Sequence, residues 1–259
     1  EAFIAFAKAN SQKSYPIHLE FNTGMNRLGI DPNDVPKCIE LLNGTAVVKV
    51  RGLQSHLAAS EDLNERDFTM GQIKSFEHLS NQFEELLGYK CLRHTDNTSG
   101  ILNYNDGHYN MVRSGIGLYG YGNDLKFDAD LRPIGSLKSN ISQIRHIKKG
   151  ESVSYNRSHI AETDMDYAVI PLGHGDGINR IYGYGKSSVR VNGKWAPALG
   201  IICMDMFMID ITGIDCKIGD EVVLFDKDHP ARDMAEKAGT ISYELLTGIQ
   251  NRVPRYYMG

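Results

Sequence analysis

Side chains that could do chemistry gather in three segments, residues 18–29, 97–99 and 111–120. The first carries Arg27 after a predicted strand, and the third places Arg113 before a glycine-rich turn. Backbone N–H groups around Gly115 and Ile116 are unshielded by large side chains and could bind a phosphate group. Thr98 offers a hydroxyl for the same kind of ligand. An ordinary turn with a solvated cation is the alternative interpretation of each segment.

Length and composition narrow the kinds of protein that could use these segments. The chain has 259 residues, 41% hydrophobic and 23% charged, which is enough for one large domain or two ordinary ones. The formal net charge is −4, without long runs of either sign, so we expect neither a nucleic-acid partner nor a membrane surface. The most apolar stretch, residues 200–211, is interrupted by Asp205 and Asp210, so no membrane span is expected.

The four cysteines lie far apart in the sequence, at Cys38, Cys91, Cys203 and Cys216. There is neither a Cys-x-x-Cys pair nor a cluster of cysteine and histidine, so we expect no metal site and no disulfide framework. A reducing cytoplasm is the simplest location for such a chain.

The first half of the chain is predicted to alternate strands and helices. Apolar and polar residues alternate over residues 17–21, and a helical pattern over about 34–42 ends at Asn43-Gly44. A second strand begins at residues 47–50. The long amphipathic helix that follows ends at Gly88 and carries its apolar face at Ile73, Phe76, Leu79, Phe83 and Leu86. With shorter strands expected at residues 91–94 and 111–113, the alternation favours a parallel sheet with crossovers.

The second half is predicted to be mostly β. Short β-branched segments stand at residues 140–147, 167–172, 187–191, 199–204, 207–211 and 221–225. Asn192-Gly193 indicates a type I′ hairpin, and a final helix over about 241–250 is expected after the N-cap candidate Thr240. We place the domain boundary between Asp128 and Pro133, which gives domains of residues 1–131 and 132–259.

Four strand candidates in the first domain are half the number that a (β/α)₈ barrel requires. The predicted fold is therefore α/β plus β, a partial barrel of the TIM type followed by a mostly β domain. The chain begins at Glu1 without Met, and Phe3, Phe6 and Ala7 already have helical spacing. We therefore expect the missing barrel strands to precede Glu1.

Eight segments, in order along the chain, resemble the motifs of alanine racemases. They are residues 18–29, 52–57, 94–98, 111–120, 150–155, 171–177, 202–205 and 239–244. Eight ordered matches are far more specific than any one of them. The resemblance implies a pyridoxal-phosphate enzyme of fold type III, with an N-terminal (β/α)₈ barrel and a C-terminal β domain, of which this chain is the C-terminal two-thirds.

The resemblance also implies a catalytic set. Racemisation removes the Cα proton on one face and returns it on the other, so the cofactor ring must stabilise the charge and two bases must flank it. In this family one base is the cofactor's lysine. The other is a tyrosine, matched by Tyr155, which a head-to-tail homodimer delivers into the partner's site. His56 matches the histidine beside it. A free phenol has a pKa of about 10, so Tyr155 would need nearby positive charge or hydrogen bonds to act as a base.

The cofactor set follows from the same resemblance. Arg113 matches the arginine that contacts the pyridine nitrogen of pyridoxal 5′-phosphate, and His94 matches the histidine that orients this arginine. A permanently charged guanidinium disfavours protonation of the ring and restricts the chemistry to proton transfer. The residues that match the phosphate-binding positions are Thr98, Gly115, Ile116 and Tyr243.

The substrate set contains two departures from the family. Arg27 and Met204 match the positions that bind the substrate carboxylate, through a guanidinium and a backbone N–H, and Asp205 follows in the same turn. Glu20 stands where some members carry a carbamylated lysine, and we expect its carboxylate to bind Arg27 directly. His174 stands where the family usually has tyrosine. This difference affects a hydrogen bond at the substrate entry and the expected substrate range.

The resemblance predicts an alanine racemase that interconverts L- and D-alanine for peptidoglycan synthesis in its complete form. The family's cofactor lysine lies in a segment that would precede Glu1, so this chain alone is expected to be inactive. Two alternatives are a serine or broad-specificity racemase and a non-catalytic fragment that binds pyridoxal phosphate or a partner. A racemase domain cut from a larger fusion is a further possibility.

Overall fold

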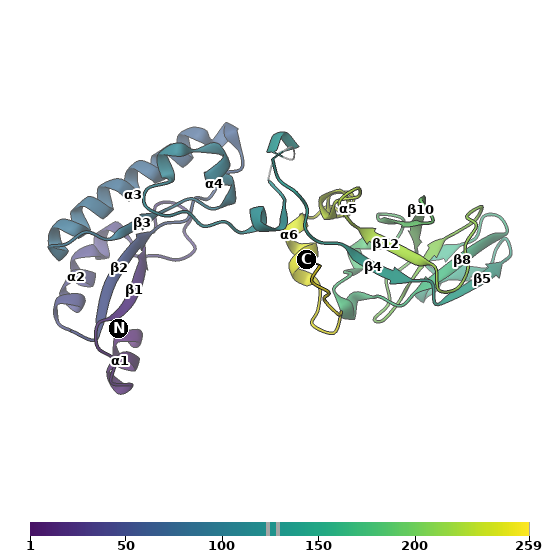
Figure 1. The fold of residues 1–259 in the computed structure, drawn as a ribbon, viewed down its shortest axis with the longest axis horizontal. Helices are drawn as coiled ribbons and strands as arrows, with labels where there is room; N and C mark the ends of the chain where they lie inside the picture. The colour runs from purple at the N-terminus through teal and green to yellow at the C-terminus, as the bar shows by residue number, and fades with distance from the viewer. Residues whose placement is uncertain (123–124, 128–129, 259) are drawn as a thin grey trace. The chain divides into compact units, whose positions relative to one another are not determined.

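In the computed structural model, which describes residues 1–122, 125–127 and 130–258, three parallel strands form the sheet of a first compact unit, Glu1–Leu131. They are β1 (Tyr15–Glu20), β2 (Val48–Gln54) and β3 (Leu92–His94), in that order across the sheet. Helix α2 (Val35–Asn43) follows β1, and helix α3 (Arg66–Leu87) follows β2 (Figure 1). The predicted alternation of strands and helices is confirmed.

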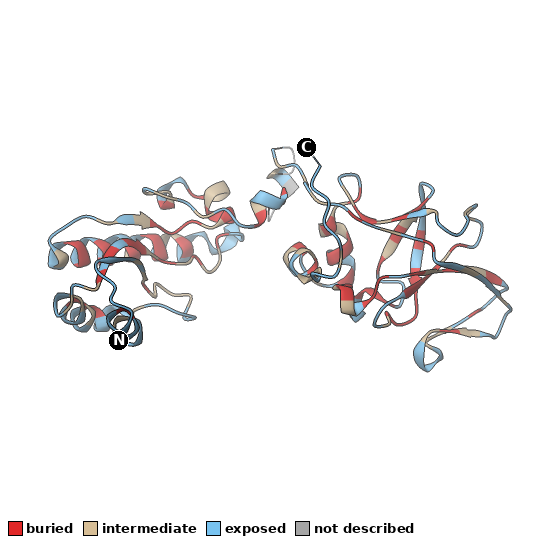
Figure 2. Cartoon of the chain, turned by 60° about the horizontal axis from the view of Figure 1, so that its bottom comes forward, coloured by how far each residue is buried: buried red, intermediate tan, exposed pale blue. Residues whose placement is uncertain are grey.

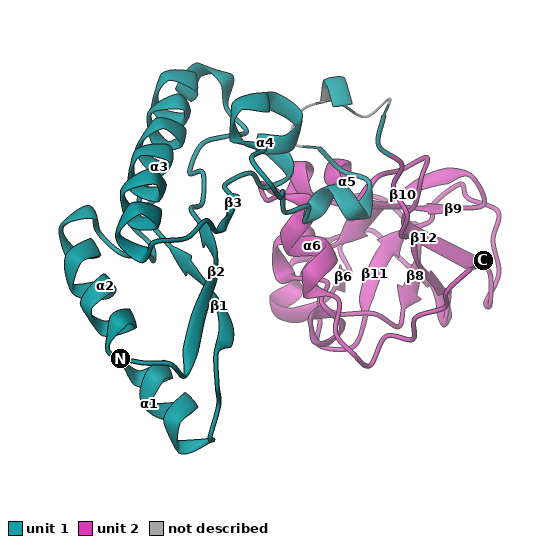
Figure 3. Cartoon of the chain, turned by 60° about the vertical axis from the view of Figure 1, so that its left-hand side comes forward, with its two compact units in different colours: residues 1–131 teal, residues 132–259 magenta. Residues whose placement is uncertain are grey.

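Helices α2 and α3 lie against the same face of this sheet (Figure 3). The core between them consists of Phe21, Val35, Ile39, Val50, Leu53, Phe76, Leu79 and Phe83. Buried residues recur along one side of α3, which ends at Gly88 with φ +78°, as its apolar period predicts (Figure 2). Ile17 and Leu19 of β1 pack against this core, so His18 and Glu20, which alternate with them, lie on the opposite face.

The predicted strand at residues 111–113 is wrong. Asn110 N–H donates to the Arg93 carbonyl and Arg113 N–H to the Asp96 carbonyl, but β3 has only three residues and no ladder continues beyond these bonds. The first unit therefore shows three strands in its described part, not four. The alternative interpretation of residues 97–99 as an ordinary turn is also wrong, because the Asn97 side chain caps a short helix, α4 (Thr98–Asn103).

Shorter helices complete the first unit. They are α1 (Ala2–Ala9) and the 3₁₀ helices η1 (Pro32–Asp34), η2 (Leu63–Glu65), η3 (Asn105–Gly107), η4 (Ile116–Tyr119) and η5 (Leu125–Phe127). The boundary predicted between Asp128 and Pro133 begins on two residues, 128 and 129, that lie outside the described ones. The chain divides into its two compact units between Leu131 and Arg132.

Seven antiparallel strands form the sheet of the second unit, Arg132–Gly259, in the order β4-β12-β9-β10-β11-β8-β5 (Figure 1). They are β4 (Leu137–Asn140), β5 (Gln143–Ile147), β8 (Met165–Ile170), β9 (Ser188–Val191), β10 (Lys194–Leu199), β11 (Phe207–Asp210) and β12 (Glu221–Phe225). Strands β6 (Ser152–Val153) and β7 (His159–Ile160) pair separately. The β-rich second half is confirmed. Only Ile141 and Ser142 separate the two edge strands β4 and β5, so the sheet curls upon itself.

Two predicted strands of the second unit are wrong in extent. Residues 140–147 form two strands, because the N–H of Ile141 donates to Asp220 while the next N–H, of Ser142, donates to Val169, so the chain changes partner strand. Only Leu199 of the predicted strand 199–204 belongs to a strand, because β10 ends there; residues 200–204 form a turn that starts at Gly200 with φ +57°. The type I′ hairpin between β9 and β10 is confirmed by positive φ at both Asn192 (+49°) and Gly193 (+79°).

The helices of the second unit are α5 (Ala231–Ala238), α6 (Ser242–Gly248), η6 (Tyr155–Arg157), η7 (His174–Asp176) and η8 (Arg180–Tyr182). Thr240 is not the N-cap of the last α-helix: Ile241 holds that position, and the Thr240 hydroxyl instead bonds the Glu244 carboxylate. None of the helices in the described ranges is long and apolar enough to cross a membrane.

Candidate active site

The carboxyl ends of the three parallel strands place a polar group at one edge of the sheet. Glu20 ends β1, Gln54 ends β2 and His94 ends β3, and the register pairs all three across the sheet. Gln54 Nε2 donates to Glu20 Oε2 over 3.0 Å. This edge is where open α/β sheets and barrels hold their ligands.

A contact between two histidines crosses the central strand. His18 lies on β1 and His94 on β3, yet Nδ1 of the first is 2.9 Å from Nε2 of the second. Gly52 of β2 lies between them, and a Cβ there would stand 2.6 Å from the His18 ring. The glycine therefore lets the imidazole of His18 lie across β2 and reach His94.

Arg113 is fixed at this edge by several acceptors. Its Nη1 donates to Nδ1 of His94 at 2.5 Å and to the carbonyl of the same residue at 3.3 Å. Its Nη2 donates to the carbonyls of Ser55 at 3.0 Å and Thr95 at 3.1 Å, and lies 3.4 Å from Nδ1 of His56. The structure thus brings the predicted residues His56, His94 and Arg113 together.

Both of these histidines are held neutral. Burial, together with the electrostatic effects of Arg113 and His18, lowers the pKa of His94 to about 4. Burial also lowers the pKa of His56, and the cations Arg113 and Arg27 lower it further. Neither imidazole therefore carries a charge near neutral pH.

Thr98 organises the glycine-rich turn. It is buried at the start of α4, and its Oγ1 accepts from Gly115 N–H at 3.0 Å and from Gly117 N–H at 3.2 Å. The Gly115 N–H, which was expected to bind a ligand, donates to the Thr98 hydroxyl in this structure, and its role toward a phosphate stays a prediction. The Ile116 N–H, at the start of η4, has no acceptor among the described residues. An O–H and an N–H donor stand side by side on the turn.

The expected ion pair between Glu20 and Arg27 is not formed. Glu20 accepts from Gln54 instead, and in the described part of the chain Arg27 has no ion-pair or hydrogen-bond partner. Arg27 is exposed. The turn before it is held by the Asn22 side chain, which accepts from the N–H groups of Gly24 and Asn26. The guanidinium is free to meet an anion.

In the second unit, Tyr155 is presented by a strained loop. Its side chain is 69% exposed. Three residues around it have positive φ although none is glycine: Ser154 at +73°, Asn156 at +55° and Arg157 at +50°. Such conformations cost free energy and persist only where surrounding contacts impose them.

Two serine hydroxyls impose this conformation. Ser154 Oγ donates to the Ile201 carbonyl at 2.9 Å and accepts the N–H of the same residue at 3.1 Å. Ser158 Oγ lies 3.2 Å from that N–H. A Cβ on Gly200 would come within 2.7 Å of both serine side chains, so the two segments meet through a glycine. The Tyr155 loop is thereby tied to the turn that carries Met204.

The turn that carries Met204 is also hydrogen-bonded, through its backbone, to the loop of His174. The N–H of His174 donates to the Cys203 carbonyl at 2.9 Å, and the N–H of Gly175 donates to the Met204 carbonyl at 2.8 Å. Met204 and Asp205 are exposed, and so is the His174 side chain. The structure thus joins the backbones that carry Tyr155, His174, Met204 and Asp205 within one unit.

Tyr243, predicted to bind phosphate, is half-buried on α6, where its carbonyl accepts from the Thr247 hydroxyl. No group of three or more His, Cys, Asp or Glu side chains that could hold a metal occurs among the described residues. All four cysteines are free.

Sequence reasoning missed three residues of these networks. His18 lies in the motif of residues 18–29, but no local sequence pattern shows that it reaches His94. Gly52 gave a signal only as a glycine in a strand, which indicates a close approach. Arg252, which bonds Asp176 and Asp205, lies near the end of the chain and gave no signal.

Family models match both units. The model for the N-terminal domain of alanine racemase matches residues 1–123, and the model for the C-terminal domain matches residues 134–257. Together the two matches cover nearly the whole chain.

Individual proteins show the same similarity. Alanine racemase 1 of Clostridium acetobutylicum is 38% identical over 255 residues, 93% of this chain and 64% of that protein. Alanine racemase of Halothermothrix orenii is 34% identical over 258 residues, 97% of this chain and 67% of that protein. The chain thus spans about two-thirds of the length of these relatives.

A solved structure is also similar to this chain. The crystal structure of alanine racemase from D-cycloserine producing Streptomyces lavendulae matches with a TM-score of 0.90 and 29% identity, covering 100% of this chain and 70% of that one. The fold is that of these racemases, with an N-terminal barrel domain and a C-terminal β domain. With both family models matched in order and relatives of this identity, the chain belongs to the alanine racemase family.

Proposed function

We propose that this chain is part of an alanine racemase that interconverts L- and D-alanine with pyridoxal 5′-phosphate. The observation that carries the proposal is the fixed Arg113 guanidinium, held by His94 and by backbone carbonyls at the carboxyl edge of the sheet. We further propose a cytoplasmic enzyme that supplies D-alanine for peptidoglycan. Residues 1–131 would be the C-terminal half of its (β/α)₈ barrel, and residues 132–259 its β domain.

The residues present fit this cofactor. The Thr98 hydroxyl accepts two N–H groups, so its own proton is left to donate, and the Ile116 N–H stands next to it. Hydroxyl and amide donors on a turn of small residues suit a phosphate. We propose that Thr98, Ile116 and Tyr243 hold the phosphate and that Arg113 faces the pyridine nitrogen.

The guanidinium of Arg113 sets the chemistry. When bound, pyridoxal phosphate would supply a conjugated ring that withdraws electrons from Cα of alanine. Arg113 cannot act as a proton donor to the ring nitrogen at neutral pH, because an arginine side chain stays protonated there. His94, neutral and accepting at Nδ1, keeps the guanidinium oriented. The side chains then favour proton transfer at Cα.

Substrate binding and proton transfer fall to the remaining residues. The free guanidinium of Arg27 and the Met204 N–H would bind the alanine carboxylate. Tyr155 Oη would take the Cα proton from one face of L-alanine, the family's lysine would supply a proton to the opposite face, and His56 would stand beside the phenol. The exposed phenol suits a head-to-tail homodimer in which Tyr155 acts in the partner's site.

Tyr155→Phe in the complete holoenzyme tests the proposal. Exchange of the Cα proton of L-alanine for deuterium in D₂O should fall by about 100-fold or more, the usual size of a general-base contribution, while cofactor absorbance is unchanged. Tyr184→Phe is the matched control, because Tyr184 is an exposed tyrosine of the same unit at 61% exposure. Undiminished exchange in the Tyr155 variant contradicts the assignment.

A broader substrate range is the second candidate function. His174 is exposed, and its neighbour Gly175 binds the Met204 carbonyl, so a change at residue 174 lies close to the proposed carboxylate site. Comparison of kcat/KM for alanine and for serine, in the wild type and in His174→Tyr, separates an alanine racemase from a serine or broad-specificity racemase.

A further inference from the structure

Arg252 joins two loops of the second unit through one side chain. Its Nε donates to Asp176 Oδ1 at 2.7 Å, and its Nη2 donates to Asp205 Oδ1, also at 2.7 Å. The guanidinium is planar and has donors at fixed angles, so it can hold two carboxylates at once in a set geometry. Asp176 closes the loop of residues 173–177, and Asp205 belongs to the turn of residues 203–206.

The two loops meet with no spare room. A Cβ on Gly173 would lie 2.4 Å from the carbonyls of Cys203 and Met204, and a Cβ on Gly175 would lie 2.7 Å from Nη2 of Arg252. The guanidinium therefore rests directly on the backbone of the 173–177 loop. Asp176 is itself tied down, because its Oδ2 accepts the Gly173 N–H at 2.8 Å.

These contacts leave the Met204 N–H free while they fix the atoms around it. The carbonyl before it, on Cys203, accepts from His174, and its own carbonyl accepts from Gly175. Cys203 N–H closes the turn on the Met206 carbonyl at 2.9 Å. Within the described residues no acceptor takes the Met204 N–H. The next residue, Asp205, is the one that Arg252 holds.

We propose that Arg252 is a positioning residue for substrate: by bridging Asp176 and Asp205 it holds the turn in which the Met204 N–H meets the carboxylate of the amino acid. This inference rests on the proposed racemase function. Arg252 touches neither cofactor nor substrate and acts through the turn alone. Its own segment is anchored independently, because Gln250 N–H donates to the Asp176 carbonyl at 2.9 Å.

Arg252→Ala in the complete holoenzyme tests the role. The carboxylate bond is made equally in the ground state and the transition state, so KM for L-alanine should rise by about tenfold while kcat stays within about twofold. Asp205→Asn is a second variant that weakens the same bridge without touching Asp176, and it should raise KM in the same way. The double variant should be no worse than Arg252→Ala alone, since the two changes break one interaction.

Arg255→Ala is the matched control. Arg255 lies three residues further on and, among the described residues, donates only to the backbone carbonyls of Ile249, Gln250 and Val253. Its loss should leave KM within about twofold of the wild type. A merely structural role for both arginines would lower the melting temperature in both variants without the change in KM.

The dissociation constant of propionate, an alanine analogue without the amine, gives a readout that needs no turnover. Calorimetry should show about tenfold weaker binding to Arg252→Ala than to the wild type. If the wild type racemises alanine and Arg252→Ala leaves both KM and the propionate affinity unchanged, the inference is overturned and the racemase proposal stands. A loss confined to kcat in this variant would lead to the same conclusion. If the wild type does not racemise alanine but its propionate affinity still depends on Arg252, the proposed racemase function is overturned. The positioning role of Arg252 is then supported.

Discussion

Arg113 donates a hydrogen bond to Nδ1 of His94 at 2.5 Å, and this contact decides where the imidazole carries its proton. A guanidinium has donors only, so Nδ1 must keep its lone pair. The proton of the neutral ring is then on Nε2, which lies 2.9 Å from Nδ1 of His18. In this arrangement His94 donates to His18 across the central strand.

His94 is expected to stay neutral across the physiological range. Burial and Arg113 lower its pKa to about 4, so it should show no titration between pH 5 and 9. Long-range ¹H–¹⁵N spectra of histidine-labelled protein should show the Nε2–H form throughout. An imidazole that titrates near pH 6.5, or that carries its proton on Nδ1, would contradict the proposed geometry. Arg113→Ala, which removes the donor, should raise this pKa.

Gly52→Ala should displace His18. The added Cβ would stand 2.6 Å from the ring, and such overpacking typically costs about 1–3 kcal/mol in the free energy of unfolding. Gly71→Ala is the control: the position lies inside α3 with nothing within 4 Å of an added Cβ, so the change should stabilise by about 0.5–1 kcal/mol. Urea unfolding of the two variants should move in opposite directions, and equal shifts would refute the crossing of β2 by His18.

Thr98→Val should weaken cofactor binding. The variant keeps the shape of the side chain but removes the acceptor of the Gly115 and Gly117 N–H groups and the proposed donor to phosphate. We expect about a tenfold or greater rise in the dissociation constant of pyridoxal phosphate, followed by its absorbance in the complete protein. Thr212→Val, at an exposed threonine of the second unit, is the control and should bind the cofactor as the wild type does.

Substitutions at Ser154 should reverse the usual ranking of alanine and glycine. Both Ser154→Ala and Ser154→Gly lose the two bonds to Ile201, but only glycine relieves the strain at φ +73°. Alanine is normally the more stable of the two by about 0.5–1 kcal/mol, because it restricts the unfolded chain. Here the glycine variant should be the more stable one in urea unfolding. The ordinary order would show that the loop around Tyr155 relaxes freely.

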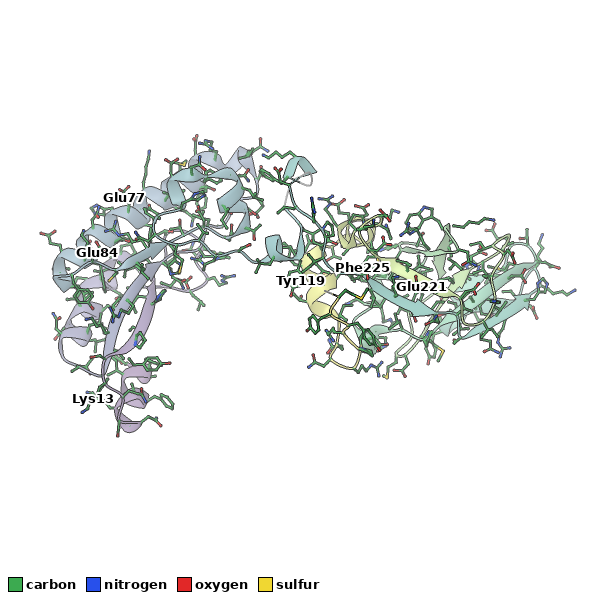
Figure 4. The ribbon with its side chains drawn as sticks, in the orientation of Figure 1. Lys13, Glu77, Glu84, Tyr119, Glu221 and Phe225 are labelled. Atoms are coloured by element: carbon green, nitrogen blue, oxygen red, sulfur yellow. The ribbon has the colours of Figure 1, made fainter. Side chains whose placement is uncertain are left out.

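Glu84 on α3, labelled in Figure 4, should make stability fall in acid. Burial by itself raises its pKa, but hydrogen bonds from Arg93, the Cys91 N–H and Lys90 outweigh it and hold the pKa at about 2. A depressed pKa stabilises the fold above the unfolded value of about 4.3. This contribution is lost as the pH falls from there toward 2.

The variant Glu84→Gln measures that contribution. At pH 7 it should destabilise by about 3 kcal/mol, because the nearly buried Arg93 loses its partner. The gap between variant and wild type should close as the pH falls from 4 toward 2. Glu85→Gln, at the exposed neighbouring position, should show neither effect. A constant gap at all pH values would mean that Glu84 acts by packing alone.

Local patterns in the amino-acid sequence are enough to predict most of the helices and strands and to recognise the family. The 3.6-residue period of apolar side chains and Gly88 defined α3, since both act within one helix. Asn192-Gly193 defined the hairpin, because only residues that accept positive φ close it. Eight ordered motifs identified the candidate residues, including Arg113, Thr98 and Tyr155, although not their contacts.

Which of these residues are in contact depends on how the chain folds in three dimensions. Periodicity carries no information on pairings between strands. It therefore predicts a strand at residues 111–113 that does not form, and it cannot show that Glu20 binds Gln54 and not Arg27. The bonds of His94 with His18 and of Arg252 with Asp176 each join residues 76 positions apart. Such contacts exist only once strand order and loop packing bring distant segments together, and no local pattern records that order.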